Sequence, residues 1–372
     1  MQNYKGNFKN FKSFLSIYVF LTLDLGCRFL KKYIFNRLIC TIFTKKLRMQ
    51  TVLEYASIFQ NYLEEHTLDK EPKNLYKPIN YILKLGGKRL RPVLTMLAAE
   101  MFNTSYQKAM PAALAIEMFH NFSLVHDDIM DDAPLRRGEQ TVHEKWDVNT
   151  GILSGDAMLI LAYQLFEQYD GTIFRELAKL FSKTAMEVCE GQQYDVDFET
   201  RDDVTLDQYL KMIEYKTAVL VGAALKMGAI IAGASHSCQE AIYTFGRDLG
   251  LAFQLQDDYL DAFGDPETFG KQVGGDIIEN KKTFLYLTAL DNSDPDEAQQ
   301  LRHLYSVSPI DPSEKIETVK QQFLDSGAAK ATQDEIKRHT QHAFEALESL
   351  KIDDSKKEVL RDFGTALMRR TV

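Results

Sequence analysis

The sequence predicts an all-α fold, a single large helical bundle with a central cavity. Apolar residues recur at a spacing near 3.6 from residue 50 onward, which is the period of an amphipathic helix. Alternating, strand-like runs are almost absent, and no helix–strand–helix repeat appears. Long apolar segments such as residues 206–231 are best buried at the centre of a bundle.

Composition narrows the class of protein. The chain has 372 residues, of which 45% are hydrophobic and 26% charged, as in ordinary soluble globular proteins. Its net charge of −9 argues against a nucleic-acid binder. The four cysteines are scattered without a C-x-x-C pair, so neither a disulfide framework nor a zinc site is indicated. This usage is typical of a reducing compartment, and we expect a cytoplasmic protein.

Residues 1–48 differ from everything that follows. They carry ten Lys or Arg residues and one Asp, whereas the remainder has a net charge of −18. Their most apolar run, residues 14–27, is shorter than the roughly 20 residues that span a membrane. One interpretation is a basic, aromatic helix on a membrane surface. We favour the other, in which the functional protein begins at Met49, so the predicted domain covers residues 49–372.

The predicted helices follow one another through this domain without a linker or a solenoid repeat. Turn residues separate them, such as Gly86-Gly87, Ala133-Pro134, Gly274-Gly275 and residues 291–295. Helical periodicity covers residues 52–66, 75–85, 93–101, 109–131, 156–169, 173–190, 206–231, 240–263 and 284–290, and then a more charged tail from 313 through 352 to 368.

Two acidic motifs occur at helix ends. In H-D-D-I-M-D-D, Asp127 and Asp131 lie at i and i+4 and so share one helix face; in D-D-Y-L-D, Asp257 and Asp261 repeat this spacing. Like charges at this spacing destabilise a helix unless a cation lies between them or the face is solvated. One such motif fits a solvated helix end as well as a metal site. Two of them favour a shared site for Mg²⁺ or Mn²⁺, which prefer oxygen ligands.

Basic residues accompany the acidic motifs. G-G-K-R-L-R-P places three of them at a helix start, where backbone N–H groups also favour phosphate. Arg136 and Arg137 follow the first acidic motif, and Lys216 lies inside an apolar helix where an unpaired charge would be costly. Lys271 and Lys281 flank a glycine-rich loop, either a mobile lid or a simple helix connection.

The sequence resembles the trans-isoprenyl diphosphate synthase (polyprenyl synthetase) family in four motifs that occur in the same order: G-G-K-R-L-R-P, H-D-D-I-M-D-D-A-P-L-R-R-G, Lys216-Thr217 and F-Q-L-Q-D-D-Y-L-D. The resemblance covers about residues 75–283 and excludes residues 1–48. It implies a homodimeric prenyltransferase that condenses isopentenyl diphosphate with an allylic diphosphate (dimethylallyl, geranyl or farnesyl) to give a short-chain all-trans product.

The resemblance also implies residue roles. Asp127, Asp131 and Asp257 would hold three Mg²⁺ ions, or Mn²⁺ in their place, and Asp261 would support them. Other side chains would bind the substrates or face the developing carbocation. The allylic diphosphate would contact Arg136, Lys216, Lys271 and Lys281; isopentenyl diphosphate would contact Lys88, Arg91, His120 and Arg137; Thr217 and Gln254, beside Lys216, would face the carbocation, and Gln192 and Asp195 would line the cavity.

Product length is expected to depend on the helix before the first acidic motif. The growing tail is expected to run from Asp127 toward the start of this helix, which rises about 1.5 Å per residue. Phe122, five residues before Asp127 and next to the small Ser123, would meet the tail first, and Phe119 lies about one turn further on. One aromatic at the fifth position before the motif, without an insertion in it, resembles geranylgeranyl diphosphate synthases. We therefore favour geranylgeranyl over farnesyl diphosphate as product. For His126, a structural role is favoured over that of a general base.

Two other functions use the same fold. A class I terpene cyclase would normally lack G-G-K-R-L-R-P and carry a different second metal motif. A non-catalytic regulatory subunit of a heteromeric prenyl synthase usually loses an acidic motif or a basic residue, whereas every expected position is present here. Turnover with isopentenyl and dimethylallyl diphosphates distinguishes the subunit from the enzyme.

Overall fold

The computed structural model describes residues 52–265 and 273–369, and the unit from Tyr55 onward is compact. The expectations for residues 1–48 and for Lys271 lie outside this part of the chain. Helices dominate the described residues, in which the only strands are the two-residue β1 (Leu135–Arg136) and β2 (Glu139–Gln140) of one antiparallel hairpin. The predicted all-α class is therefore confirmed.

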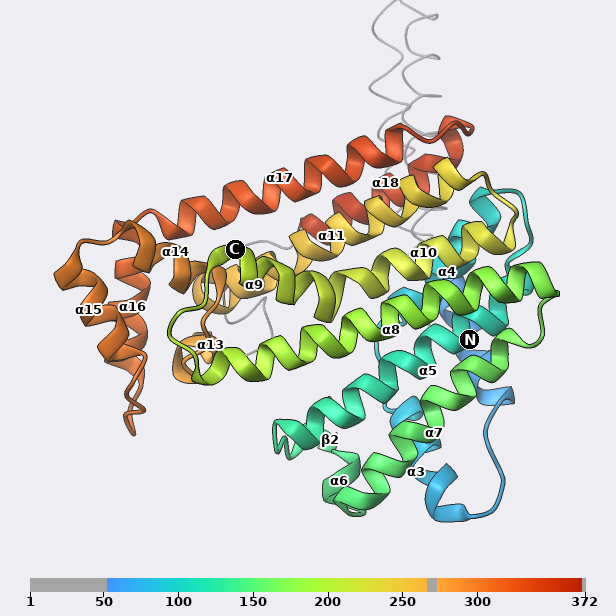
Figure 1. Ribbon diagram of the computed structural model, residues 1–372, viewed down its shortest axis with the longest axis horizontal. Helices are drawn as coiled ribbons and strands as arrows, with labels where there is room; N and C mark the ends of the chain where they lie inside the picture. Colours follow the sequence, from blue (N-terminus) through green and yellow to red (C-terminus); the bar gives the residue numbers. More distant parts are fainter. Residues whose placement is uncertain (1–51, 266–272, 370–372) are drawn as a thin grey trace, which may run out of the picture. The chain divides into compact units, whose positions relative to one another are not determined.

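The long helices pack side by side in a series. Helix α4 packs between α5 and α10, α10 packs on α11, and α11 packs on α17 (Figure 1). Residues 52–65 form a further helix before α3. The further elements are α3 Lys73–Lys84, α4 Leu90–Met101, α5 Tyr106–Met130, α6 Val142–Lys145, α7 Val148–Phe166, α8 Gly171–Thr200, α9 Leu206–Ile213, η1 Glu214–Ala218, α10 Val219–Ile231, α11 His236–Phe263, α13 Gly275–Ile278, α14 Phe284–Asn292, α15 Pro295–Leu304, α16 Ser313–Asp325, α17 Ala328–Glu348 and α18 Asp354–Met368.

Short polar side chains set where several of these helices begin. Asp147 accepts a hydrogen bond from the Thr150 amide at the start of α7, eight residues before the expected helix begins at residue 156. Asp170 does the same for α8, and Thr205 forms a capping box with Gln208 at the start of α9. Such caps satisfy backbone N–H groups that the first helical turn leaves unpaired.

Two apolar clusters make up much of the core. One joins α4, α10, α11, α17 and α18 around Phe245 and Leu249. The other joins α9, α11 and α14–α17 around Leu255 and Phe323. Helix α11 contributes to both, so the second acidic motif is carried by a helix that is buried along most of its length. No helix in the described ranges is long and apolar enough to cross a membrane.

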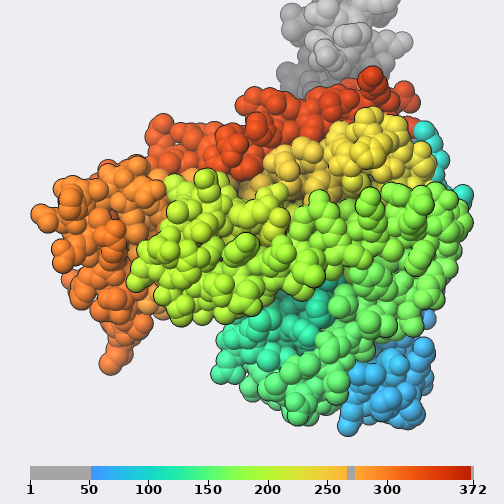
Figure 2. Space-filling model, viewed as in Figure 1, coloured from blue at the N-terminus to red at the C-terminus, as the bar shows by residue number. Residues whose placement is uncertain are grey.

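Two helices differ from the sequence-based expectation. The apolar segment 206–231 is not one α-helix, because five residues, Glu214–Ala218, form the π-helical segment η1 between α9 and α10. Helix α8 continues ten residues past its expected end at residue 190 and finishes at Thr200. In Figure 2, α8 forms a band across the visible face of the molecule.

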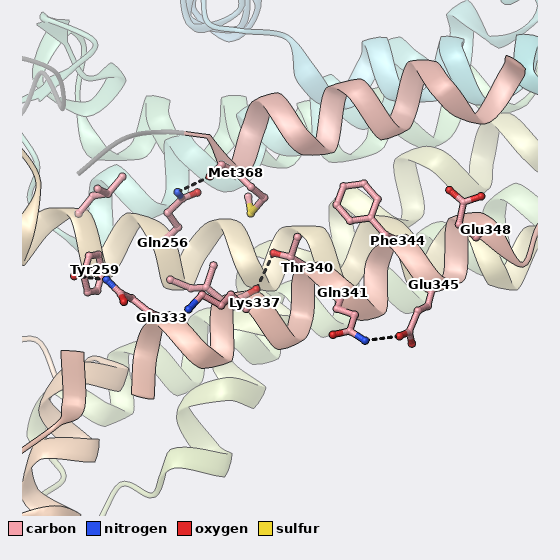
Figure 3. Close-up of a pocket in the computed structure, with 12 residues that line it drawn as sticks. Gln256, Tyr259, Gln333, Lys337, Thr340, Gln341, Phe344, Glu345, Glu348 and Met368 are labelled. Carbon is pink, nitrogen blue, oxygen red and sulfur yellow. Dashed lines mark hydrogen bonds between the residues drawn. The ribbon is translucent and has the colours of Figure 1, made fainter. Parts of the chain in front are cut away.

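A groove of about 830 Å³ lies along α11, α17 and the end of α18 (Figure 3). Two of its polar side chains are bonded within the groove: Gln333 Nε2 donates to Tyr259 Oη at 2.6 Å, and Gln256 Nε2 donates to the Met368 carbonyl at 3.2 Å. None of the predicted site residues in the described part of the chain lines it.

Candidate active site

A second cavity, of about 340 Å³, brings the predicted residues together. It lies where α5, α8, η1 and α10 meet, and α4 contributes one side chain. Apolar side chains such as Val188 and Leu220 line part of its wall. The predicted residues that line it are Arg91, His120, Phe122, Ser123, Asp127, Gln192, Lys216 and Thr217.

The first acidic motif holds two basic side chains, of which Lys216 lines this cavity together with Asp127. Asp127 lies 3.5 Å from Arg136 Nη2 and 3.4 Å from Lys216 Nζ. Its neighbour Asp128 is buried, and both its carboxylate oxygens accept hydrogen bonds from Arg136 Nε, at 2.8 and 2.9 Å. Burial raises the pKa of Asp128, although Arg136 opposes the shift. Asp128, for which no role was predicted from the sequence, thus fixes the position of Arg136.

Lys216 is positioned by the π-helical segment. Its ammonium pairs with Asp195 of α8 and with Asp127 of α5. Burial alone would lower the pKa of Lys216, but Asp195 and Asp127 more than offset it and raise the pKa, so the side chain is charged at neutral pH. A Cβ at Gly191 would lie 2.3 Å from the Lys216 amide nitrogen. Only glycine therefore lets α8 approach η1 this closely.

The second acidic motif is tied to η1 by a chain of hydrogen bonds. Thr217 Oγ1 donates to Gln254 Oε1 at 3.4 Å, and Gln254 Nε2 donates to Asp258 Oδ1 at 3.0 Å. Tyr209 Oη donates to the other oxygen of Asp258. Burial raises the pKa of Asp258. Thr217 and Gln254 were both predicted to face the carbocation, and in the structure their side chains are in contact.

Asp261 faces the loop that follows the second motif. Its Oδ2 accepts a hydrogen bond from the Asp276 amide at 2.9 Å, at the start of α13. Lys281, three residues after α13, pairs with Glu279 at 2.8 Å and lies 3.8 Å from Asp276. Desolvation lowers the pKa of Lys281, but Glu279 and Asp276 raise it above its usual value. Lys281 also acts electrostatically on Asp131, which relates this loop to the first motif.

The acidic residues fit an oxygen-binding metal ion. Asp127 Oδ1 is buried and accepts no hydrogen bond from the described residues, although the Lys216 ammonium lies 3.4 Å away. Desolvation and the nearby Asp127 raise the pKa of Asp131. No three carboxylates of the two motifs have oxygens within 4.8 Å of one another in the described ranges. The carboxylates of the two motifs therefore do not form a three-ligand cluster by themselves; Mg²⁺ usually completes its shell with water and substrate phosphate oxygens.

The two basic motifs lie against each other, and Arg91 of the first of them lines the cavity. Arg91 Nη1 lies 3.2 Å from His120 Nε2, and burial together with Arg91 lowers the pKa of His120 well below its usual value. His120 is therefore neutral and accepts the hydrogen bond. Arg137 donates to the Gly86 carbonyl and covers Gly87, where φ is +120° and a Cβ would lie 2.9 Å from the guanidinium.

The two other basic residues of G-G-K-R-L-R-P differ in their surroundings. Arg89 is buried, pairs with Glu117 of α5 and donates to the Leu83 carbonyl, so it stabilises the fold. Lys88 is exposed. The motif thus divides between the buried, structural Arg89 and the exposed Lys88.

Aromatic residues form part of the cavity wall and the packing behind it. Phe122 lines it, and its ring centroid lies 5.5 Å from that of Phe119 and 4.8 Å from that of His126. Phe119 does not line the cavity; it is fully buried behind Phe122 and packs edge-to-face on Phe181 of α8 at 5.2 Å. His126 Nε2 lies 3.2 Å from the Ile152 carbonyl of α7, in agreement with a structural role.

An all-α bundle with this arrangement of acidic and basic motifs defines a class of prenyltransferases. The polyprenyl synthetase family profile matches residues 72–323, and the chain belongs to that family. A geranylgeranyl diphosphate synthase of Methanosarcina mazei is 44% identical over 222 residues, which are 59% of this chain and 68% of that protein. A geranylfarnesyl diphosphate synthase of Natronomonas pharaonis is 35% identical over 86% of this chain and 97% of its own.

Solved structures agree with the sequence relatives. A crystal structure of a geranylgeranyl pyrophosphate synthase is 57% identical, with a TM-score of 0.82 over 86% of this chain and 99% of its own. The resemblance to short-chain trans-isoprenyl diphosphate synthases is therefore confirmed, and the chain is a prenyltransferase. The residue roles that the resemblance implies remain predictions.

Proposed function

We propose that this chain condenses isopentenyl diphosphate with an allylic diphosphate, in the presence of Mg²⁺, to give geranylgeranyl diphosphate. The observation that carries the proposal is a single cavity whose lining combines the charged Asp127 and Lys216 with apolar side chains such as Phe122, Val188 and Leu220. The charged part of this lining suits a diphosphate and the apolar part suits an isoprenoid tail. Two of the relatives above are named for geranylgeranyl synthesis.

The charged end of the cavity serves ionisation of the allylic substrate. Asp127, Asp131 and Asp257, with Asp261 in support, would hold three Mg²⁺ ions, or Mn²⁺ in their place. When bound, such ions neutralise the charge of the leaving diphosphate. Lys216 and Arg136 act on the same group, and the structure has already fixed both by carboxylates, so little reorganisation is needed.

Neighbouring side chains then serve the carbocation and the second substrate. Thr217, next to Lys216 in the chain, donates a hydrogen bond to Gln254, and the oxygen dipoles of the two side chains would face the developing positive charge. Arg91, Arg137 and neutral His120 form the site for the second diphosphate. After the allylic C–O bond breaks, the double bond of isopentenyl diphosphate attacks the cation and forms the new carbon–carbon bond. The proton that is then lost goes to the departing diphosphate.

We further propose a cytoplasmic homodimer. Apolar side chains on the outer side of α7 support it: Ile152, Leu153 and Ile160 are 40%, 60% and 58% exposed. Water contact with such a set is unfavourable, and a second copy of this helix would cover it. Light scattering of the purified chain should give twice the monomer mass, and Leu153→Glu should yield monomers.

Product analysis tests the proposed reaction. The chain is incubated with labelled isopentenyl diphosphate, Mg²⁺ and each allylic starter in turn, and the products are separated by chromatography. We expect geranylgeranyl diphosphate as the main product, and loss of turnover after removal of divalent ions or in Asp127→Asn. Absence of turnover from a protein with intact helical circular dichroism would favour the regulatory-subunit alternative instead.

A further inference from the structure

Three potential metal ligands lie together outside the cavity, at the far side of the turn that ends α5. They are Asp132, His143 and Glu144, and one donor atom of each lies within 4.8 Å of the other two. In the described part of the chain no other set of three His, Cys, Asp or Glu residues meets this distance. Asp132 is the last residue of the first acidic motif, and His143 and Glu144 belong to α6. Helix α6 follows the β1–β2 hairpin in the chain and lies next to it (Figure 1).

The hairpin brings these residues together. Thr141 is fully buried; its Oγ1 donates to the Ala133 carbonyl at 2.8 Å, and its amide donates to the Pro134 carbonyl at 3.2 Å. These bonds close the loop from residue 133 to residue 141. The residue before the loop, Asp132, is thereby placed beside the short helix that carries His143 and Glu144.

Asp132 does not share the surroundings of its neighbour Asp131. Asp131 responds electrostatically to Asp127, Lys216 and Asp195, which surround the candidate active site. Asp132 has a φ of +49°, in the left-handed region that aspartate tolerates better than most residues. The chain reverses at this residue, and its carboxylate lies beside His143 and Glu144, although His143 also acts electrostatically on Asp128 of the same motif.

His143 gives the independent indication of a ligand. The residue is only 8% exposed, and neither ring nitrogen has a hydrogen-bond partner among the described residues. Its Nε2 lies 3.8 Å from Glu144 Oε1, which is too far for a hydrogen bond. A buried imidazole with two unbonded nitrogens is costly, and such groups in folded proteins are normally satisfied. A metal ion between the three side chains would satisfy one nitrogen.

We propose that Asp132, His143 and Glu144 bind one divalent transition-metal ion of the zinc type, separate from the Mg²⁺ of the diphosphate site. One imidazole nitrogen and two carboxylate oxygens suit Zn²⁺, whereas Mg²⁺ prefers oxygen ligands throughout. Asp132 and Glu144 are exposed, so the ion can enter from solvent and keep water in its remaining positions. The bound ion would fasten α6 to the end of α5 and so brace the hairpin that carries Arg136 and Arg137.

Zinc binding to the full-length chain tests this site. Metal-free protein in excess Mg²⁺ is titrated with Zn²⁺ against a chromophoric chelator, and bound Co²⁺ is followed by its visible absorption. We expect one Zn²⁺ per chain at this site and a loss of affinity of more than about tenfold in His143→Gln, Asp132→Asn and Glu144→Gln. His303→Gln, at an exposed histidine of α15, is the matched control and should bind as the wild type does.

Two results would overturn the proposal. Because His143 is buried, its variant alone could lose affinity through misfolding; Asp132→Asn and Glu144→Gln change exposed side chains, and unchanged affinity in both would exclude the site. Asp127→Asn/Asp131→Asn removes the predicted diphosphate-side ligands and should leave Zn²⁺ affinity within about twofold of the wild type, far less than the loss expected for a ligand. Abolished binding in that variant would place the ion in the diphosphate site instead.

Discussion

Replacing Phe122 with alanine should lengthen the product by one five-carbon unit. Phe122 lines the cavity and is its predicted floor, and the next aromatic residue toward the start of α5 is Phe119, whose ring centroid lies 5.5 Å from that of Phe122. The two differ by three residues, so the floor would descend by about 4.5 Å along the helix axis. This descent is close to the length that one isoprene unit adds to an extended tail.

The substitution should leave the fold intact. Truncating a fully packed phenylalanine costs roughly 3–5 kcal/mol, and Phe122 should cost less because one side of its ring already faces the cavity. Phe119→Ala alone should not change product length, since Phe122 still closes the cavity above it. The double variant should extend the product further than Phe122→Ala does.

Chromatography of the dephosphorylated products, with farnesyl diphosphate as starter, measures the effect. The matched control is Phe174→Ala on α8, a partly exposed phenylalanine that does not line the cavity; its product should equal that of the wild type. If Phe122→Ala is folded and active yet yields the wild-type product, Phe122 is not the floor and the tail takes another path.

Two further predictions concern helix contacts. Gly191→Ala would place a methyl 2.3 Å from the Lys216 amide nitrogen and should lower both stability, by about 1–3 kcal/mol, and turnover, whereas Gly171→Ala on the same helix meets nothing within 4 Å and should change neither; thermal unfolding and steady-state kinetics measure both. Asp248 is buried, and hydrogen bonds to it, notably from His339, lower its pKa although burial opposes them. Its ionised form therefore stabilises the fold above the unfolded-state pKa of about 3.9, and this contribution is lost as pH falls through the lower folded-state pKa. Urea unfolding should show Asp248→Asn less stable than the wild type at pH 7, and a difference that did not shrink in acid would contradict the reasoning.

The helices and the motifs could be predicted because both depend on local patterns. Apolar periodicity located most helix cores, and the spacing of Asp127 and Asp131 is visible in the chain itself. The predicted end of α8 was wrong because residues 191–200 are mostly polar and lack a continuous apolar stripe. The helix nevertheless continues to Thr200, because Gly191 packs against η1 and Phe198 is buried.

Contacts between distant residues could not be predicted. The pairing of Arg89 with Glu117 spans 28 positions, and nothing in G-G-K-R-L-R-P separates that buried arginine from Arg91. Asp128 is similar: its sequence neighbourhood resembles that of Asp127, yet it faces Arg136 from a buried position. Such roles depend on which face of a helix is covered, and that requires the packed structure.

The π-helical segment makes helix register as important to this site as residue identity. An α-helix advances by about 100° per residue, so deleting one residue within Glu214–Ala218 could restore regular hydrogen bonding while rotating one half of the helix against the other. Lys216 and Thr217 could then no longer both keep their present partners on α8 and α11. The composition of the chain would hardly change, but two side chains of the candidate site would be moved apart. For a designer who shortens or grafts this helix, the count of residues between α9 and α10 is therefore a constraint in its own right.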